Sequence, residues 1–254
     1  IMPPCFGMYA LSARVQGARV VEAPLIDHGD AFQAPDDLIE RARDCKLAFL
    51  CTPNNPTGNS LPPETVDAVC RALGGRGLVV VDEAYVEFQD SPSFTTRLEQ
   101  HSNLVVLRTL SKAHALAGCR LGTVIANPAV IGLLKRIIAP YPLPTPTVEA
   151  ALAALTPDAL TTQAEHIALL DAEKKRLVDA LNDRAGIQAL WPGDANFVLV
   201  RVTDAAGLVD DAAAAGIRLR NQSAQRGLDN CVRITVGTPD ENSALIEFLE
   251  GWAP

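Results

Sequence analysis

Three apolar segments in the first half of the chain are each followed by a polar group that could take part in chemistry. The amide Asn55 lies in TPNNPTG (residues 52–58), the carboxylate Asp82 ends VVVD, and the amine Lys112 follows VVLRTLS. Ligands of open α/β sheets bind outside the carboxyl ends of the strands. A carboxylate placed there is costly without a cationic partner, and a lysine at the same edge can supply one. The pattern therefore predicts a ligand site that contains these three groups.

Each of these residues also has a simpler interpretation. TPNNPTG has the composition of an ordinary turn, Asp82 could cap a helix, and a lone lysine is most often a solvated surface charge. Arg120 follows in GCRLG (residues 118–122), close enough along the chain to return to the same edge. Spacing alone leaves both interpretations open.

Strand and helix patterns alternate through the first half of the chain, which predicts an α/β fold with a mainly parallel sheet sandwiched by helices. As continuous apolar runs, the strands are expected to be covered on both faces. They are expected at residues 19–22, 46–51, 78–82, 104–108 and 122–126. Residues 63–73 repeat apolar positions at helical spacing and stop at Gly74, and Pro128 is expected to open a second helix.

A run of prolines interrupts this pattern. Pro140, Pro142, Pro144 and Pro146 argue against regular helix and central strand in that stretch. We therefore expect a large domain of residues 1–145 and a smaller C-terminal α+β domain of residues 146–254. The smaller domain is expected to have helices at residues 148–155, 166–182, 207–215 and 240–250, and strands at residues 196–202 and 232–236.

The composition argues against several functional classes. With 22 basic and 30 acidic residues the formal net charge is −8, so nucleic acid is not an expected partner. No apolar run approaches the ~20 residues that cross a bilayer, so no membrane contact is expected. The six cysteines form no CxxC pair and no cluster with histidines, which predicts reduced thiols and no metal site. We expect a soluble, cytoplasmic protein.

Several longer segments carry a resemblance to a known family. They are FGMY (6–9), TPNNPTG (52–58), VVDEAY (80–85), TLSKAHALAGCRLG (109–122), IAPYPLPTP (138–146), ANFVL (195–199), and LRNQ (219–222) with VRITVG (232–237). In this order they make nearly the whole chain resemble the fold type I pyridoxal-phosphate aminotransferases, and most closely the histidinol-phosphate aminotransferases. The general assignment depends on Asn55, Asp82, Tyr85, Lys112 and Arg233. The histidinol-phosphate assignment depends chiefly on IAPYPLPTP and LRNQ.

This resemblance implies pyridoxal 5'-phosphate as the cofactor and a role for each matched residue. Lys112 would bond covalently to the cofactor and, once released, move the α-proton of the substrate. Asp82 would keep the pyridine nitrogen protonated, which makes the ring an electron sink. The other cofactor contacts would be Asn55 and Tyr85 to the phenolic oxygen, Ser111 and Arg120 to the phosphate, and Phe6, in place of the family's usual Tyr, against the ring face.

The resemblance also implies the substrates. Arg233 would anchor the substrate carboxylate with Arg220 beside it, and two planar guanidinium forks suit a phosphate as well as a carboxylate. Arg220 could instead form a surface ion pair. Tyr141 and Asn196 would line the substrate side. The implied reaction is transamination between histidinol phosphate or imidazole-acetol phosphate and glutamate or 2-oxoglutarate, in L-histidine biosynthesis.

Family members carry roughly a quarter to a third more chain ahead of the FGMY segment. That region supplies part of the phosphate cradle and the residues that one subunit lends to the other in a homodimer. We therefore expect either a longer protein or a remnant with an incomplete site. The alternatives are a decarboxylase of the threonine-phosphate type, which removes CO₂ instead of a proton, and a truncated non-catalytic domain of this fold. An NAD-dependent oxidoreductase is disfavoured because no GxGxxG follows the first strand.

Overall fold

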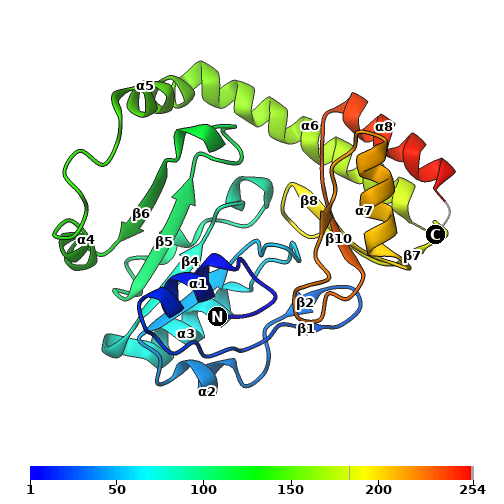
Figure 1. Ribbon diagram of the computed structural model, residues 1–254. Coiled ribbons are helices and arrows are strands. Elements are labelled where there is room, and N and C mark those ends of the chain that lie inside the picture. Colours follow the sequence, from blue (N-terminus) through cyan, green and yellow to red (C-terminus); the bar gives the residue numbers. More distant parts are fainter. Residues whose placement is uncertain (183, 253–254) are drawn as a thin grey trace.

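A four-stranded sheet organises the N-terminal part of this computed structural model, which describes residues 1–182 and 184–252. Its strands are β3 (Leu47–Cys51), β4 (Leu78–Asp82), β5 (Leu104–Thr109) and β6 (Gly122–Ala126), in that spatial order. The first three run parallel, so their carboxyl ends share one edge, which we call the rim, while β6 runs antiparallel to β5. The expected α/β class with a mainly parallel sheet is confirmed (Figure 1).

Helices pack on both faces of this sheet. α3 (Pro63–Leu73) has the bounds that the apolar spacing predicts, and α2 (Leu38–Ala42) packs beside it. The apolar stripe of α3 is at most 1 % exposed and consists of Val66, Val69, Cys70 and Leu73. On the opposite face α1 (Met8–Val15) lays Tyr9 on Phe49 of β3, with ring centroids 5.2 Å apart. The rim therefore lies between α1 and the loops that follow the strands.

The shorter elements connect these layers. β1 (Ile26–Asp27) and β2 (Phe32–Gln33) form a separate antiparallel pair. Single turns of 3-10 helix are η1 (Gly74–Arg76), η2 (Val86–Phe88), η3 (Phe94–Arg97) and η4 (Ala117–Cys119).

The strand expected at residues 19–22 does not form. Backbone hydrogen bonds join this region to the first residues of the chain, from Ile1 N to Val21 O at 3.1 Å and from Ala23 N to Ile1 O at 2.9 Å. A hollow of about 460 Å³ is lined both by this segment and by β3. A ladder requires neighbouring strands about 4.8 Å apart, and the segment has no such neighbour among the described strands.

β6 departs from the expectation of burial on both faces. Its residues from Gly122 to Ile125 are exposed, whereas β3, at the other edge of the sheet, is largely buried. α4 (Pro128–Leu134) follows and opens at Pro128 as predicted, but none of its described side chains is buried. The apolar side chains of β6 and α4 therefore lie at the surface.

A second, antiparallel sheet organises the C-terminal part. Its spatial order is β7 (Ile187–Trp191), β8 (Phe197–Val202), β10 (Cys231–Thr235) and β9 (Arg220–Asn221). The helices are α5 (Thr145–Ala154), α6 (Pro157–Leu181), α7 (Ala205–Ala214) and α8 (Pro239–Gly251). The expected helices and strands are present, whereas β7, β9 and the first turns of α6 were not predicted. Pro146 lies in the first turn of α5, where a missing N–H breaks no helical hydrogen bond, so the expectation of no helix there was wrong.

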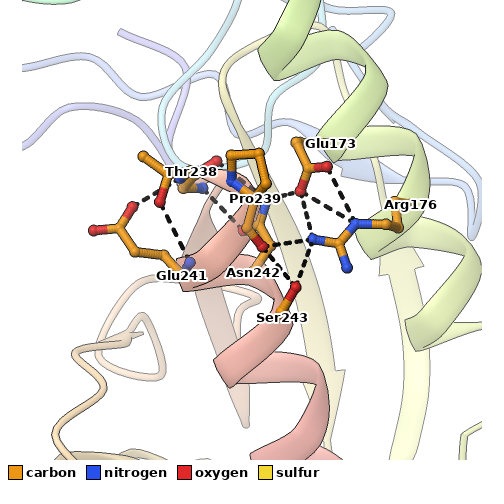
Figure 2. Close-up of polar contacts among 8 residues, drawn as sticks. Glu173, Arg176, Thr238, Pro239, Glu241, Asn242 and Ser243 are labelled. Atoms are coloured by element: carbon orange, nitrogen blue, oxygen red, sulfur yellow. Dashed lines mark hydrogen bonds and ion pairs between the residues drawn. The ribbon is translucent and has the colours of Figure 1, made fainter.

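A polar network joins α6 to the start of α8 (Figure 2). The buried Asn242 donates through Nδ2 to Glu173 Oε2 at 2.9 Å, and Arg176 Nη2 donates to the same oxygen at 2.7 Å. Thr238 and Glu241 close a capping box at the first turn of α8. α6 runs from α5 to the second sheet (Figure 1), and this network fixes its far half.

The division into residues 1–145 and 146–254 remains a prediction, and residues 183, 253 and 254 of the second range lie outside the described residues. Side chains from both ranges share one core, in which Phe32 packs on Trp191 with ring centroids 5.2 Å apart.

Three further findings concern the classes of site considered above. No helix in the described part of the chain is long and apolar enough to cross a membrane. Among the same residues no three His, Cys, Asp or Glu side chains gather as a metal ion would require. All six cysteines are free thiols.

Candidate active site

Asp82 occupies the carboxyl end of β4 and lies on the rim. Its Oδ2 accepts a hydrogen bond from the Tyr9 hydroxyl at 2.6 Å, and its Oδ1 accepts one from the backbone N–H of Ala84 at 3.1 Å. The second bond is the local cap-like contact that the simpler interpretation of Asp82 expected. The first joins residues 73 positions apart and gives the carboxylate a fixed orientation.

Lys112 follows β5, the neighbour of β4, and its side chain is exposed. Its Nζ lies 5.2 Å from the centroid of the Tyr85 ring. No ion pair joins Lys112 to Asp82 in the described part of the chain, so the expected lysine–carboxylate pair does not form in this structure. The structure does place both residues at the carboxyl ends of adjacent strands.

Arg233 of β10 reaches the rim from the second sheet. Its Nη1 donates to Asn55 Oδ1 at 2.6 Å, and its guanidinium lies 4.9 Å from the centroid of the Phe197 ring. Tyr85 packs edge-on against the same ring, with centroids 5.3 Å apart. These contacts bring together Asn55, Tyr85 and Arg233, which the sequence placed in one site.

The surroundings of Arg233 are unusual for a cation. Burial lowers the pKa of its guanidinium; Tyr85 acts in the opposite direction, and the positive charge of Arg220 adds to the lowering. Arg220 is exposed and lies directly opposite Arg233 in the β9–β10 ladder. Arg233 Nε is buried without a partner among the described residues. A half-buried guanidinium beside a second cation favours an anion, which points to a carboxylate or phosphate ligand.

Ser111 and Arg120 lie on two segments that run side by side after β5 and before β6. The backbone N–H of Leu110 donates to Leu121 O at 3.3 Å, which joins these segments. The Thr109 hydroxyl donates to Ser111 Oγ at 2.9 Å, and the exposed Arg120 donates through Nη1 to Ala117 O at 3.0 Å. The structure therefore places both residues near the rim, with Ser111 next to Lys112 in sequence and Arg120 in the segment that returns to β6.

The remaining predicted site residues differ in placement. Phe6 is 45 % exposed and meets Tyr9 edge-on at 5.7 Å. Asn196 precedes β8 and its carbonyl accepts from Val236 N at 3.0 Å. Tyr141 is 96 % exposed, and its ring pairs with none of the other aromatic rings in the described part of the chain. Its role stays a prediction.

Tyr9 is the site residue that the sequence reasoning missed. The FGMY segment was recognised, but no role was given to its last residue. Tyr9 follows Phe6 by three positions across the turn that leads into α1, and the two rings meet edge-on. That spacing could have indicated that Tyr9 points to the same site as Phe6.

A contact between glycines holds the Asn55 loop in place. Asp194 N donates to Gly58 O at 2.7 Å, and a Cβ on Gly193 would lie 2.5 Å from Gly58 Cα. The turn of residues 193–195, which precedes β8, is also held by Lys174 of α6. The Lys174 Nζ donates to the carbonyls of Gly193 and Ala195 at 2.6 and 2.8 Å. The long helix therefore supports the loop that carries Asn55.

The charges of the rim suit a charged cofactor and substrate. Asp82, Lys112 and Arg233 have no ionic partner within 4 Å among the described residues. Asp82 could pair with a ring N–H, Lys112 could react as an amine, and Arg233 could bind an acid. These are the donors and acceptors that pyridoxal phosphate and an amino-acid substrate require.

Comparisons with known proteins agree with this arrangement. The family model of aminotransferase class I and II matches residues 1–249. The chain is 45 % identical over 252 residues to a histidinol-phosphate aminotransferase of Stenotrophomonas maltophilia, covering 98 % of this chain and 69 % of that protein. It is 26 % identical to the histidinol-phosphate aminotransferase of Clostridium acetobutylicum, with a TM-score of 0.88 over 98 % of this chain and 75 % of that one.

A second solved structure is the histidinol-phosphate aminotransferase of Sinorhizobium meliloti in complex with pyridoxal-5'-phosphate. It is 26 % identical with a TM-score of 0.87, covering 99 % of this chain and 70 % of that one. The family match over nearly all residues and the shared fold lead to one conclusion: the chain belongs to the class I and II aminotransferases.

Proposed function

We propose that this chain performs pyridoxal-phosphate-dependent transamination between histidinol phosphate, or imidazole-acetol phosphate, and glutamate or 2-oxoglutarate, in L-histidine biosynthesis. The observation that carries the proposal is the meeting of Asn55, Tyr85 and Arg233 beside the rim that holds Asp82 and Lys112. The curated relatives at about 45 % identity support the choice of substrate.

The residues present fit the cofactor. When bound, pyridoxal phosphate supplies an electron sink for the α-carbon of the substrate. Asp82 would accept a hydrogen bond from the protonated ring nitrogen, and Tyr85 with Asn55 would hold the phenolic oxygen. Lys112 would hold the aldehyde carbon and move the α-proton. The phosphate would lie against Ser111 and Arg120, and the ring face against Phe6.

The substrates would bind through the arginines. Arg233 is positioned by Asn55 and Phe197, and Arg220 lies beside it on the next strand. A glutamate carboxylate needs one guanidinium, whereas a phosphate of nearly two charges can engage both. Asn196 and Tyr141 are proposed to line the substrate side.

We also propose that the protein works as a homodimer in the cytoplasm. Large apolar side chains are exposed along α4, α5 and the segment between them, among them Ile137 at 81 %, Leu152 at 66 % and Leu133 at 61 %. Such surfaces mark interfaces with other chains. Six free thiols suit a reducing compartment. Sedimentation equilibrium tests the dimer, and a single species of monomer mass at micromolar concentration would refute it.

The experiment that tests the function is product analysis with the cofactor added. Histidinol phosphate and 2-oxoglutarate are expected to give imidazole-acetol phosphate and glutamate, measured by mass spectrometry. Threonine phosphate supplied alone is the control substrate, because a decarboxylase would release CO₂ from it. CO₂ release would favour the decarboxylase, and a protein that binds cofactor without any product would favour a non-catalytic domain.

A further inference from the structure

We propose that Tyr9 is a positioning residue that holds the Asp82 carboxylate in place for the pyridine nitrogen of the cofactor. This inference rests on the proposed function and assigns to Tyr9 a task distinct from contact with the cofactor itself. Its basis is the hydrogen bond from the Tyr9 hydroxyl to Asp82 Oδ2 at 2.6 Å.

The two oxygens of Asp82 are held by donors from different elements. Ala84 N–H, on the loop after β4, holds Oδ1, and Tyr9, on α1, holds Oδ2. A carboxylate held by one donor can rotate about its last side-chain bond, whereas a carboxylate held at both oxygens cannot do so without losing a bond. Each oxygen still has a lone pair for another donor. Tyr9 therefore leaves room for a ring N–H and fixes the direction from which it must come.

The Tyr9 ring is itself held on two sides. It is 8 % exposed, lies nearly parallel to Phe49 with an interplanar angle of 18°, and meets Phe6 edge-on. These contacts fix the hydroxyl against Asp82. Phe6 is the residue proposed to meet the ring face of the cofactor, so α1 would carry both the stacking surface and the support for the carboxylate.

Tyr9 acts as a hydrogen-bond donor and not as an acid or base. Burial, the nearby Cys51 and the Asp82 carboxylate all raise the pKa of Tyr9 well above its ordinary value. The hydroxyl keeps its proton throughout the range in which enzymes of this kind work. A hydrogen bond from a neutral donor to a carboxylate is stronger in surroundings of low dielectric constant. The neutral hydroxyl also adds no positive charge that would compete with the cofactor for Asp82.

The test compares Tyr9→Phe with a packing control, Phe49→Leu. Both change the same pair of stacked rings, but only the first removes the hydroxyl. Each variant is loaded with pyridoxal phosphate labelled with ¹⁵N in the ring, and the ring nitrogen is followed by NMR as a function of pH. The dissociation constant of the cofactor is measured in parallel, and the melting of the cofactor-free proteins verifies that each variant folds.

Tyr9→Phe is expected to bind the cofactor about tenfold more weakly, as the loss of one hydrogen bond to a charged group implies. Its ¹⁵N resonance is expected to move toward that of neutral pyridine, and to move further than in Phe49→Leu, which loosens the stacked rings but keeps the hydroxyl. In an Asp82→Asn background, Tyr9→Phe is expected to add no further change to the resonance, because it acts through Asp82.

The outcomes separate this inference from the function on which it rests. A wild-type protein that binds no cofactor overturns both. A wild-type protein that binds it, with an unchanged resonance in Tyr9→Phe, or with an equal change in Phe49→Leu, overturns the positioning role alone. A further change in the Asp82→Asn background would also overturn it, since Tyr9 would then act on the cofactor by another route.

Discussion

At the residue scale, the main feature of the site is that its charges are satisfied by neutral groups. Asp82 accepts bonds from a hydroxyl and a backbone amide, and Arg233 donates to the amide of Asn55. Partly buried charges without counter-ions cost stability. Such an arrangement is expected where a ligand brings the opposite charges, and it favours a binding role for these residues over a structural one.

Arg220 and Arg233 are expected to differ in their response to substitution. Arg220→Ala should weaken reaction with histidinol phosphate roughly ten- to a hundredfold and reaction with glutamate less, because only the phosphate engages both guanidinium groups. Arg233→Ala should impair both half-reactions. Single-turnover absorbance measured separately with each substrate tests this. If Arg220→Ala slowed the reactions with both substrates equally, Arg220 would not be recognising the phosphate. That result would favour an aminotransferase of broader specificity.

The residue scale also shows what the sequence could predict of the site. Asn55, Asp82 and Lys112 directly follow apolar strands, so their place on the rim follows from the α/β pattern. The contact of Arg233 with Asn55 spans 178 residues, and the contact of Tyr9 with Asp82 spans 73. No local pattern encodes such contacts, so the arginine was placed through family resemblance and Tyr9 was missed.

At the element scale, the rim depends on the fit between the Asn55 loop and the turn before β8. Gly58 and Gly193 both have positive φ, of 77° and 57°, and their backbones touch. Lys174 holds this turn from α6. The C-terminal part therefore supports the loop by close backbone packing as well as by the reach of Arg233.

Gly193→Ala is expected to destabilise the protein by roughly 1–3 kcal/mol, because its Cβ would overlap Gly58 and its φ disfavours a side chain. It should also weaken cofactor binding by shifting the Asn55 loop. Gly132→Ala in α4 is the matched control, since its Cβ would meet nothing within 4 Å. Urea unfolding and cofactor titration measure both effects. Gly193→Ala with the stability and affinity of the control would contradict this account.

The α6–α8 network (Figure 2) is expected to make stability depend on pH. The hydrogen bonds from Arg176, followed by those from Asn242, lower the pKa of Glu173 below its ordinary value. A carboxylate with a lowered folded-state pKa stabilises the protein above the ordinary pKa of Glu, and this contribution is lost as the pH falls through the folded-state value.

Glu173→Gln should therefore reduce the melting temperature near neutral pH and flatten its decline in acid. Glu247→Gln, at an exposed position of α8, is the control and should keep the wild-type profile. Thermal melts between about pH 3 and about pH 7 provide the comparison. A Glu173→Gln profile parallel to that of the wild type would show that the network carries no pH dependence.

The elements also show where sequence patterns are sufficient. α3 was predicted with its bounds because its apolar period, first-turn proline and terminal glycine agree. The prediction of a strand at residues 19–22 was wrong because a strand forms only beside a second strand. The sequence of the segment does not show whether such a neighbour is present. The buried faces expected for β6 were also wrong, because what covers the faces of a strand depends on how the other elements pack and not on its own apolar run.

At the scale of the whole molecule, the two sheets meet around one site. The first supplies Asp82 and Lys112, the second supplies Arg233, and α6 connects them (Figure 1). The chain spans about 69–71 % of the length of the curated relatives it matches. The match to the family model covers residues 1–249, which include the rim and the strand that carries Arg233.

Lys112 and Lys174 are the two candidates for the lysine that bonds covalently to the cofactor. Burial lowers the pKa of Lys174, which would make its amine more nucleophilic, but its Nζ is committed to the carbonyls of Gly193 and Ala195. Lys112 is exposed at the rim, between Ser111 and the Arg120 turn, and its Nζ lies over Tyr85. Placement favours Lys112 over the lysine with the lowered pKa.

The central claim is therefore tested most directly by trapping the cofactor on its lysine. The protein is incubated with pyridoxal phosphate, reduced with borohydride, digested and mapped by mass spectrometry, with Lys112→Ala as the control variant. We expect the added mass on the peptide that contains Lys112, and no stoichiometric label in the variant. A label on Lys174, or the same labelling in Lys112→Ala as in the wild type, would contradict the account.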